Sequence, residues 1–127
     1  MKKQLVDYKY HSYISFMVDT TKHTIHFKNA NDLSNLQDDS VSLVVTSPPY
    51  PMIEMWDDSF AAQNPAIGKA LERNDSDNAF ELMHQVLDKV WEECYRVLHK
   101  GGIACINIGD ATRTIKKKFQ LFLIIVE

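Results

Sequence analysis

The chain contains one short stretch, Thr46-Ser47-Pro48-Pro49-Tyr50, whose residue types could carry chemistry. Each proline fixes φ and lacks an N–H, and Pro49 also holds Pro48 in an extended conformation, so the stretch should form a stiff corner. The Ser47 hydroxyl and the backbone carbonyls can accept hydrogen bonds, and the Tyr50 ring offers a flat surface. Such a corner fits a planar group that carries an –NH₂. The alternative is that the prolines only end a strand and that Tyr50 packs in the core.

Two apolar strands and one helix are expected to position this corner. Residues 41–46 are largely apolar, which is typical of a strand in a sheet that is buried on both faces. Residues 78–100 carry apolar side chains at three- and four-residue spacing, and a second apolar strand follows at 103–108. The order strand, helix, strand predicts a parallel βαβ crossover. Ligands bind beyond the carboxyl ends of such strands, which is where the corner lies.

The expected helix carries its own boundary signals. Asn78 and Glu81 have the spacing of a reciprocal capping pair at the start. Arg96, His99 and Lys100 fall in the last turn, and Gly101-Gly102 is expected to end the helix.

The remaining segments give weaker signals. Residues 8–28 contain β-favouring and alternating side chains and are expected to be extended. A short helical turn is expected at 33–36 and a second turn at 38–40. Residues 57–76 are interrupted by Asp, Asn, Pro and Gly, which predicts a long loop or lid with one helical turn at most.

The residues of the corner resemble a known family. "VVTSPPY" looks like the catalytic motif of the amino-methylating DNA methyltransferases, in the serine form typical of enzymes that act on the exocyclic amine of cytosine. "NANDL" resembles the polar turn that precedes this strand in the family, and "VWEECYRVLHKGGIACINIGD" resembles its next helix, Gly-Gly turn and strand. The similarity runs from about Thr24 to Thr114. The motif order resembles the permuted class, in which the Gly-rich cofactor loop comes last.

The resemblance implies part of a Rossmann-like methyltransferase fold of the α/β class, with a mostly parallel sheet and a crossover helix. It implies that S-adenosyl-L-methionine donates a methyl group to N4 of a cytosine that is flipped out of double-stranded DNA, as part of restriction–modification. Ser47 and the Pro48 carbonyl would accept the two amine hydrogens, Pro49 would stiffen the corner, and Tyr50 would stack on the base. Methylation of N6 of adenine is the alternative within the class, and serine rather than aspartate at position 47 favours cytosine.

Three further residues are candidates for the cofactor site. The resemblance puts Asp32 near the adenine end of the cofactor. Thr46 and Asp110 lie at the expected ends of the two strands, and the alternative for Asp110 is a plain turn residue. No metal is expected, because the chemistry of the motif needs none. The other acidic side chains near the corner are expected to lie on a mobile loop: Glu54, Asp57 and Asp58.

The chain departs from the family pattern in two respects. Its four glycines form no Gly-rich cofactor loop after a strand, and little sequence follows Thr114 that could serve as a target-recognition region. We therefore expect residues 1–127 to form a partial catalytic domain, from a truncated gene or as one half of a split enzyme. Such a half would act with a complementing chain or as a homodimer. The rival from another class is a non-enzymatic remnant.

The composition narrows the choice of function classes. Hydrophobic residues make up 45%, and the net charge of −3 argues against binding of nucleic acid through bulk electrostatics alone. No apolar run reaches the roughly 18 residues of a membrane span, and no signal peptide is recognised, so the cytoplasm of a prokaryote or a phage-infected cell is the expected location.

Cys94 and Cys105 lack ligand spacing and are expected to be buried free thiols. Trp56 is expected to pack in the core, and residues 116–118 to form a solvated basic face; the alternatives are a wall of the base pocket and a phosphate contact.

Overall fold

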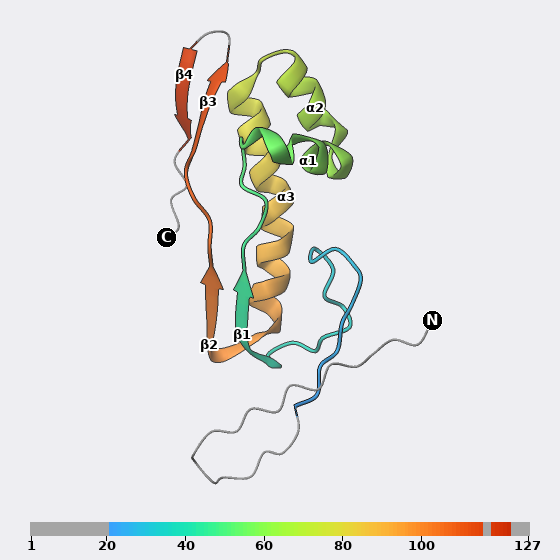
Figure 1. Cartoon of the computed structure of the whole chain (residues 1–127). Coiled ribbons are helices and arrows are strands. Elements are labelled where there is room, and N and C mark those ends of the chain that lie inside the picture. The colour runs from blue at the N-terminus through green and yellow to red at the C-terminus, as the bar shows by residue number, and fades with distance from the viewer. Residues whose placement is uncertain (1–20, 116–117, 123–127) are drawn as a thin grey trace, which may run out of the picture.

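The computed structural model describes residues 21–115 and 118–122. Its helices lie on one side of two long, nearly aligned strands, and a hairpin continues from the second strand (Figure 1). The elements, in chain order, are β1 (Val41–Thr46), the 3-10 turn η1 (Glu54–Trp56), α1 (Asp57–Gln63), α2 (Pro65–Glu72), α3 (Ser76–Val97), β2 (Leu98–Ile106), β3 (Ala111–Ile115) and β4 (Lys118–Phe122).

The two central strands form the predicted crossover. β1 and β2 pair in parallel, with Val44 opposite Ala104 and Thr46 opposite Ile106, and α3 lies in the connection between them. The parallel pairing follows from the helix, which carries the chain back to the starting edge of the sheet. The prediction of an α/β fold with a parallel sheet and a crossover helix is therefore confirmed.

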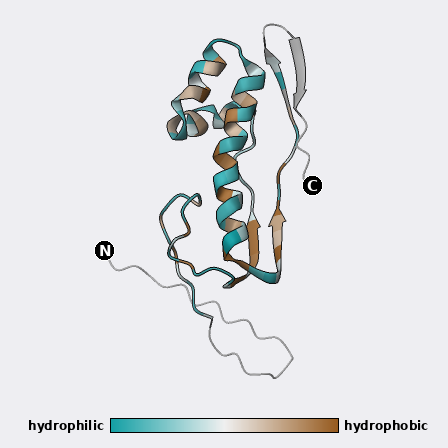
Figure 2. Ribbon diagram, turned by 180° about the vertical axis from the view of Figure 1, so that it is seen from behind, coloured by the Kyte–Doolittle hydropathy of each residue, from teal (hydrophilic) through white to brown (hydrophobic). Residues whose placement is uncertain are grey.

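One face of this sheet is uncovered among the described residues. Val44 and Thr46 are half-buried, whereas Leu43, Val45 and Ile103 are 54%, 71% and 60% exposed. β1 and the later part of β2 are coloured as apolar in Figure 2. The prediction of a sheet buried on both faces is wrong for the described part of the chain, because α3 lies along only one side and two strands alone enclose no second layer.

The open face also changes the prediction for the cysteines. Cys105 pairs with Val45 and is exposed, so the expectation of a buried thiol is wrong for this residue. Cys94 on α3 is half-buried, and burial raises the pKa of its thiol, because a thiolate is poorly solvated there. Both are free thiols, as expected.

Residues 57–76 are not a loop, which corrects the prediction for this segment. They form α1, α2 and the start of α3. The Asn64 side chain accepts a hydrogen bond from the Ala66 N–H at 3.1 Å, and Pro65 occupies the first helical position, so a local cap separates two short helices. Phe60 and Ile67 are buried, which ties both helices to the core. The polar residues that suggested a loop lie on exposed faces and at helix ends.

The boundaries of α3 differ from the predicted ones. The helix begins at Ser76, and its cap residue Asp75 makes no side-chain capping bond, so the expected pair of Asn78 and Glu81 does not cap it. It ends at Val97, and the next three residues belong to β2. Backbone hydrogen bonds from Asp39 and Ser40 to the last carbonyls of α3 turn the chain into the strand before the glycines are reached.

The two consecutive glycines lie inside β2 and serve the strand instead of ending the helix. The register between β1 and β2 shifts in this region, and Gly101 has φ of +83°. At Gly102 a Cβ would lie 2.6 Å from Leu98 Cδ2 and 2.9 Å from the His99 carbonyl oxygen. Gly102 therefore permits a close backbone approach that a side chain would block.

The core lies between the first half of α3, the two short helices and the segment that follows the corner. Trp56 packs against this core, as expected. The core thus gathers at the carboxyl end of β1 and not beneath the sheet. Its buried members are Met52, Phe60, Ile67, Ala70, Ala79, Met83, Val86, Leu87 and Ala111.

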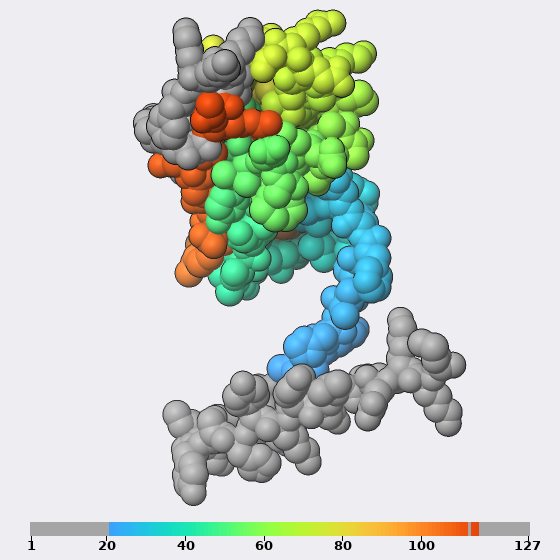
Figure 3. All heavy atoms as spheres, turned by 45° about the horizontal axis from the view of Figure 1, so that its top comes forward, coloured from blue at the N-terminus to red at the C-terminus, as the bar shows by residue number. Residues whose placement is uncertain are grey.

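The segment before β1 contains no strand among its described residues, so the β-favouring residues expected to be extended, as far as 21–28 are concerned, form no strand. Ile25 and Phe27 are 76% and 92% exposed, and residues 21–30 extend away from the body of the molecule (Figure 3). Residues 8–20 lie outside the described part. The expected turns are present, with a hydrogen bond from the Leu36 N–H to the Leu33 carbonyl and φ of +52° at Asp39.

A C-terminal hairpin was not expected. β3 and β4 pair antiparallel, with Ala111 opposite Phe122. Of the basic residues 116–118, the first two lie outside the described residues, and the third begins β4. No described helix has the length and hydropathy needed to cross a membrane.

Candidate active site

The corner Ser47–Tyr50 lies at the carboxyl end of β1, next to the end of β2. The Asn107 N–H donates a hydrogen bond to the Thr46 carbonyl at 2.9 Å, so the segments that leave both strands stay together. Thr46 is half-buried opposite Ile106. Asp110 is exposed in the connection between β2 and β3. The structure therefore brings the corner, Thr46 and the Asp110 segment to one edge of the sheet.

The residues of the corner differ in their exposure to solvent. Ser47 is exposed and Pro48 is buried, while Pro49 and Tyr50 are half-buried. No hydrogen-bond partner of the Ser47 hydroxyl is found among residues 21–115 and 118–122. A buried proline anchors the corner, and the hydroxyl beside it is available to accept a hydrogen bond from a ligand.

The chain leaves the corner through a tight turn. The Ile53 N–H donates to the Tyr50 carbonyl at 3.3 Å, with Pro51 second and Met52 third in the turn. Met52 has φ of +65°, so the turn has the pattern of type II. The Met52 N–H donates to the Sδ atom of Met83 at 3.3 Å. These contacts fix the backbone on which the Tyr50 ring is carried.

The Tyr50 ring lies against the segment that follows β2. A Cβ on Gly109 would be 3.4 Å from Cε2 and 3.8 Å from Cδ2 of Tyr50, so the glycine lies directly beside the ring. Tyr50 does not pack deep in the core, which is the alternative considered from the sequence, because the ring is half-buried.

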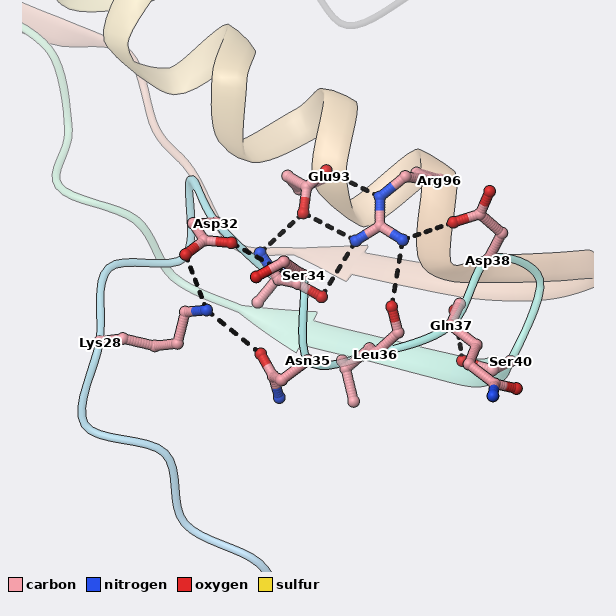
Figure 4. Close-up of polar contacts among 11 residues, drawn as sticks. Lys28, Asp32, Ser34, Asn35, Leu36, Gln37, Asp38, Ser40, Glu93 and Arg96 are labelled. Atoms are coloured by element: carbon pink, nitrogen blue, oxygen red, sulfur yellow. Dashed lines mark hydrogen bonds and ion pairs between the residues drawn. The ribbon is translucent and has the colours of Figure 1, made fainter.

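Asp32 lies in the loop that precedes β1, next to Glu93 and Arg96 near the end of α3 (Figure 4). Its carboxylate pairs with the Lys28 ammonium at 2.9 Å and accepts a hydrogen bond from the Ser34 N–H at 3.0 Å. Hydrogen bonds from Ser34 and Lys28 hold the pKa of Asp32 well below its usual range. The Lys28 ammonium also donates to Asn35, which ties the start of the loop to its middle.

An arginine on α3 holds this loop in place (Figure 4). Arg96 pairs with Glu93 through two hydrogen bonds of 2.8 Å and with Asp38 at 2.6 Å. It also donates to the Leu33 and Leu36 carbonyls at 3.0 and 3.1 Å. Arg96 therefore satisfies backbone groups that lie far from it in the sequence, and we call Glu93, Arg96 and the residues 33–38 they hold the loop clamp.

Charge pairing shifts the pKa values of the clamp. The hydrogen bonds from Arg96, and then the bond from the Leu33 N–H at 2.7 Å, lower the pKa of Glu93 to about 2. The hydrogen bonds to Glu93 and Asp38 raise the pKa of the Arg96 guanidinium. Both groups stay ionised over a wide pH range, as expected for a charge-assisted pair.

The loop clamp borders an open, polar depression of about 530 Å³. A cavity of this size is within the range of small-molecule sites, but such sites are mostly apolar, and Leu36 is the apolar member of this lining. The lining is Asn31, Asp32, Ser34, Asn35, Leu36, Gln37, Asp38, Glu93 and Arg96. These residues suit the polar part of a ligand better than a flat aromatic ring.

One ion pair near the corner was missed from the sequence. Arg113 on β3 donates to both carboxylate oxygens of Asp57, at 2.9 and 2.7 Å, and both side chains are about four-fifths buried. The pairing raises the pKa of Arg113. Asp57 is thus not a mobile acidic residue, as the sequence had suggested, whereas Glu54 and Asp58 are exposed. The pair joins the hairpin to α1, and a separation of 56 residues hid it from the sequence.

Potential metal ligands do not cluster in the described part of the chain, where no group of three His, Cys, Asp or Glu side chains could hold an ion. His84 lies half-buried on α3. Burial lowers its pKa, its ring lies edge-on to Phe80 with 4.4 Å between centroids, and its buried Nε2 has no partner among the described residues.

Comparisons with known proteins indicate the same family as the residues of the corner. The family model N6_N4_Mtase, described as DNA methylase, matches residues 41–126. The chain is 53% identical over 103 residues to the type II methyltransferase M.MthZI of Methanothermobacter thermautotrophicus, covering 80% of this chain and 29% of that protein. It is 52% identical over 114 residues to the type II methyltransferase M.MjaI of Methanocaldococcus jannaschii, covering 81% and 38%. The chain spans about a third of the length of these curated relatives, and no solved structure matches it.

Proposed function

Since the chain belongs to the DNA methylase family, whose model matches residues 41–126, we propose that it carries the catalytic corner of a cytosine-N4 DNA methyltransferase. The reaction is transfer of a methyl group from S-adenosyl-L-methionine to the exocyclic amine of a flipped cytosine in a specific double-stranded DNA sequence. A role in restriction–modification is consistent with the two relatives, which are named type II methyltransferases. On this proposal, residues 1–127 form the part of the catalytic domain that contains the corner.

The observation that carries the proposal is the exposed Ser47 next to the buried Pro48 at the carboxyl end of β1. The amine of cytosine is a poor nucleophile, because its lone pair is delocalised into the ring. Ser47 Oγ and the Pro48 carbonyl accept its two hydrogens, which favours a tetrahedral nitrogen with an available lone pair. These acceptors are held by a stiff backbone, so little reorganisation is needed during the reaction.

Tyr50 and Pro49 have supporting roles in this proposal. Tyr50 stacks on the flipped base, and the half-buried ring beside Gly109 supports this because it leaves part of the ring accessible. Pro49 keeps Ser47 and Tyr50 at a fixed separation through its locked φ. Orientation of the base by this corner supplies much of the rate acceleration.

The cofactor supplies a methyl group on a sulfonium, which is electrophilic enough for direct transfer without a covalent enzyme intermediate. Thr46 and Asp110 suit a position beside the cofactor, because they lie at the same edge of the sheet as the corner. Asp32 fits less well, since its carboxylate already pairs with Lys28 and Ser34 in the loop before β1. We propose that Asp32 binds the adenine end once the cofactor replaces the Lys28 contact.

The open face of the sheet favours a second form of the proposal. Leu43, Val45 and Ile103 are exposed, although parallel sheets normally have both faces covered. In this form the chain contributes the corner, and a complementing chain contributes the Gly-rich loop and the DNA-recognition region.

Methyl transfer to unmethylated genomic DNA with radiolabelled S-adenosyl-L-methionine tests the proposal. We expect label in DNA, with or without a complementing chain, and N4-methylcytosine after nucleoside digestion. Ser47→Ala should lower the rate by roughly 100-fold, the cost of losing one preorganised hydrogen-bonding group. Ser59→Ala is the matched control, because Ser59 is an exposed serine on α1.

Three results would contradict parts of the proposal. N6-methyladenine as the product would replace cytosine by adenine. An unchanged rate for Ser47→Ala would remove the corner from the mechanism. Binding of S-adenosyl-L-methionine by the isolated chain in isothermal titration, together with transfer by that chain alone, would exclude the need for a complementing chain.

A further inference from the structure

The turn after the corner contains a backbone conformation that is uncommon for its residue. Met52 has φ of +65°, a region that glycine adopts freely and that other residues adopt at a cost. The third position of a type II turn usually carries glycine or asparagine for this reason. Burial of a methionine side chain does not require this conformation. Such outliers persist only where the surrounding structure holds them, and they cluster at functional sites.

Two buried contacts hold Met52 in this conformation. Its side chain is 1% exposed within the core, and its N–H donates to the Sδ atom of Met83, which is fully buried. The turn is closed by the bond from the Ile53 N–H to the Tyr50 carbonyl. The turn that follows Tyr50 is therefore held by a buried residue two positions later.

One edge of the Tyr50 ring is bounded by Gly109. This glycine does not have a positive φ, so it is not required for backbone conformation. A Cβ at this position would lie 3.4 Å from Tyr50 Cε2, an ordinary van der Waals contact, so alanine fits there and only the extra methyl groups of a larger side chain would compete for space beside the ring. Gly109 thus lies in contact range of one edge of the ring.

We infer that Met52 and Gly109 are positioning residues for Tyr50: Met52 sets the turn that carries the ring, and Gly109 brings the segment after β2 against one edge of the ring. The inference rests on the proposed function, because the role of Tyr50 as the platform for the flipped base belongs to that proposal. Neither residue touches the base or the cofactor in this scheme, and both act through the orientation of the ring.

Fluorine NMR of the full chain labelled with 3-fluorotyrosine tests the inference without any catalytic assay. The chain has five tyrosines, and the Tyr50 signal is assigned by its loss in Tyr50→Phe. Met52→Gly adopts positive φ without strain but removes the buried side chain that holds the turn, so the Tyr50 signal should shift. Met52→Val is β-branched and is strongly disfavoured in this region, so the Tyr50 signal should shift while the exposed Tyr95 signal stays.

Further variants keep the test independent of folding. Met83→Leu conserves volume and removes the sulfur acceptor of the Met52 N–H, so it should also shift the Tyr50 signal in a folded chain. Gly109→Val should shift it as well. Met55→Val is the matched control, since Met55 is three residues from Met52 and 74% exposed. An unmoved Tyr50 signal in Met83→Leu and Gly109→Val would overturn the inference.

Kinetics of methyl transfer separate this inference from the proposed function. If the ring position matters, Met52→Val should lower kcat by about tenfold or more, with a smaller change in KM for DNA. An unchanged kcat in a variant with a shifted Tyr50 signal would overturn the inference and leave the proposed function standing. Absence of transfer by the unmodified chain, with or without a complementing chain, would contradict the proposed function, and the NMR result would still decide whether Met52 and Gly109 hold the ring.

Discussion

Arg96 donates hydrogen bonds from all three of its guanidinium nitrogens to the residues that precede β1 and to Glu93. Arg96 can donate to this many partners because the planar guanidinium carries five donors in a fixed geometry. A lysine at this position could not satisfy two backbone carbonyls and two carboxylates together. At the scale of single residues, the position of the Asp32 loop thus depends on one arginine and on the ionised state of its neighbour.

The acid stability of the chain should depend on Glu93. Its pKa falls from an ordinary 4.5 to about 2 on folding, so the ionised form is favoured by the folded state. The stability this provides is complete above about pH 4.5 and is lost as the pH falls from there through about 2. Glu93→Gln should lower the urea unfolding midpoint at pH 7, and the difference from the unmodified chain should shrink at pH 4 and largely vanish near pH 2.

Glu92→Gln is the matched control for this prediction, because Glu92 is the exposed neighbour on α3. It should leave the midpoint nearly unchanged at each pH. A constant difference between Glu93→Gln and the unmodified chain across the pH range would show that the Glu93 charge is not responsible.

At the scale of the elements, the space available for a side chain differs between Gly102 in β2 and Gly68 in α2. A Cβ at Gly102 would lie 2.6 Å from Leu98 Cδ2, 2.9 Å from the His99 carbonyl and 3.3 Å from the Ser42 carbonyl. At Gly68 on α2 it would meet only Ala61 Cβ, at 3.5 Å, an ordinary contact. We expect Gly102→Ala to destabilise the chain by about 1–3 kcal/mol through backbone displacement.

Gly68→Ala should instead stabilise the chain by about 0.4–1 kcal/mol, because alanine restricts the unfolded chain and suits a helix. Urea unfolding of the two variants measures both effects. Equal effects of the same sign would mean that the close packing of β2 against β1 does not set the requirement for glycine.

The elements with strong apolar periodicity could be predicted from the sequence. The short helices that depend on a local cap could not. The strand 41–46 and the apolar stripe of α3 are visible because one type of side chain repeats at a fixed spacing. The short helices α1 and α2 were missed because their polar residues resemble loop residues, and the bond from the Ala66 N–H to Asn64 is a local cap within a polar stretch. The boundaries of α3 were wrong because backbone bonds from residues 39 and 40 end the helix.

The residues of the candidate site divide in the same way. Ser47 to Tyr50 could be found from the sequence because proline and a neighbouring hydroxyl have local consequences. The contacts of Asp57 with Arg113 and of Gly109 with Tyr50 join residues more than 50 positions apart, and no local pattern marks them. The positive φ of Met52 was equally invisible, because methionine gives no signal for it.

At the scale of the whole molecule, the exposed face of the β1–β2 sheet should promote self-association of this chain. Burying one valine side chain is worth about 1.5–3 kcal/mol, and 1.4 kcal/mol corresponds to a tenfold change in affinity. Val45→Lys should therefore weaken self-association by about tenfold or more in sedimentation velocity, because Val45 is 71% exposed on that face.

Tyr95→Lys provides the comparison, since Tyr95 is 85% exposed on α3. It changes exposed apolar area and charge in a similar way at a site away from the sheet face. Equal weakening by both changes would assign the association to general hydrophobicity and charge, and not to the sheet.

The parallel pairing of β1 with β2 also affects the chain while it is being synthesised. Residues that meet across these strands, such as Ser42 and His99, are 57 positions apart. At about 5–20 residues per second, β1 leaves the ribosome roughly 3–11 seconds before its partner exists. During that interval Asp38 and Asp39 precede the apolar strand and Pro48 and Pro49 follow it. Charges and prolines at these positions act as gatekeepers against premature strand pairing, so the corner that serves catalysis in our proposal also protects the nascent chain from aggregation.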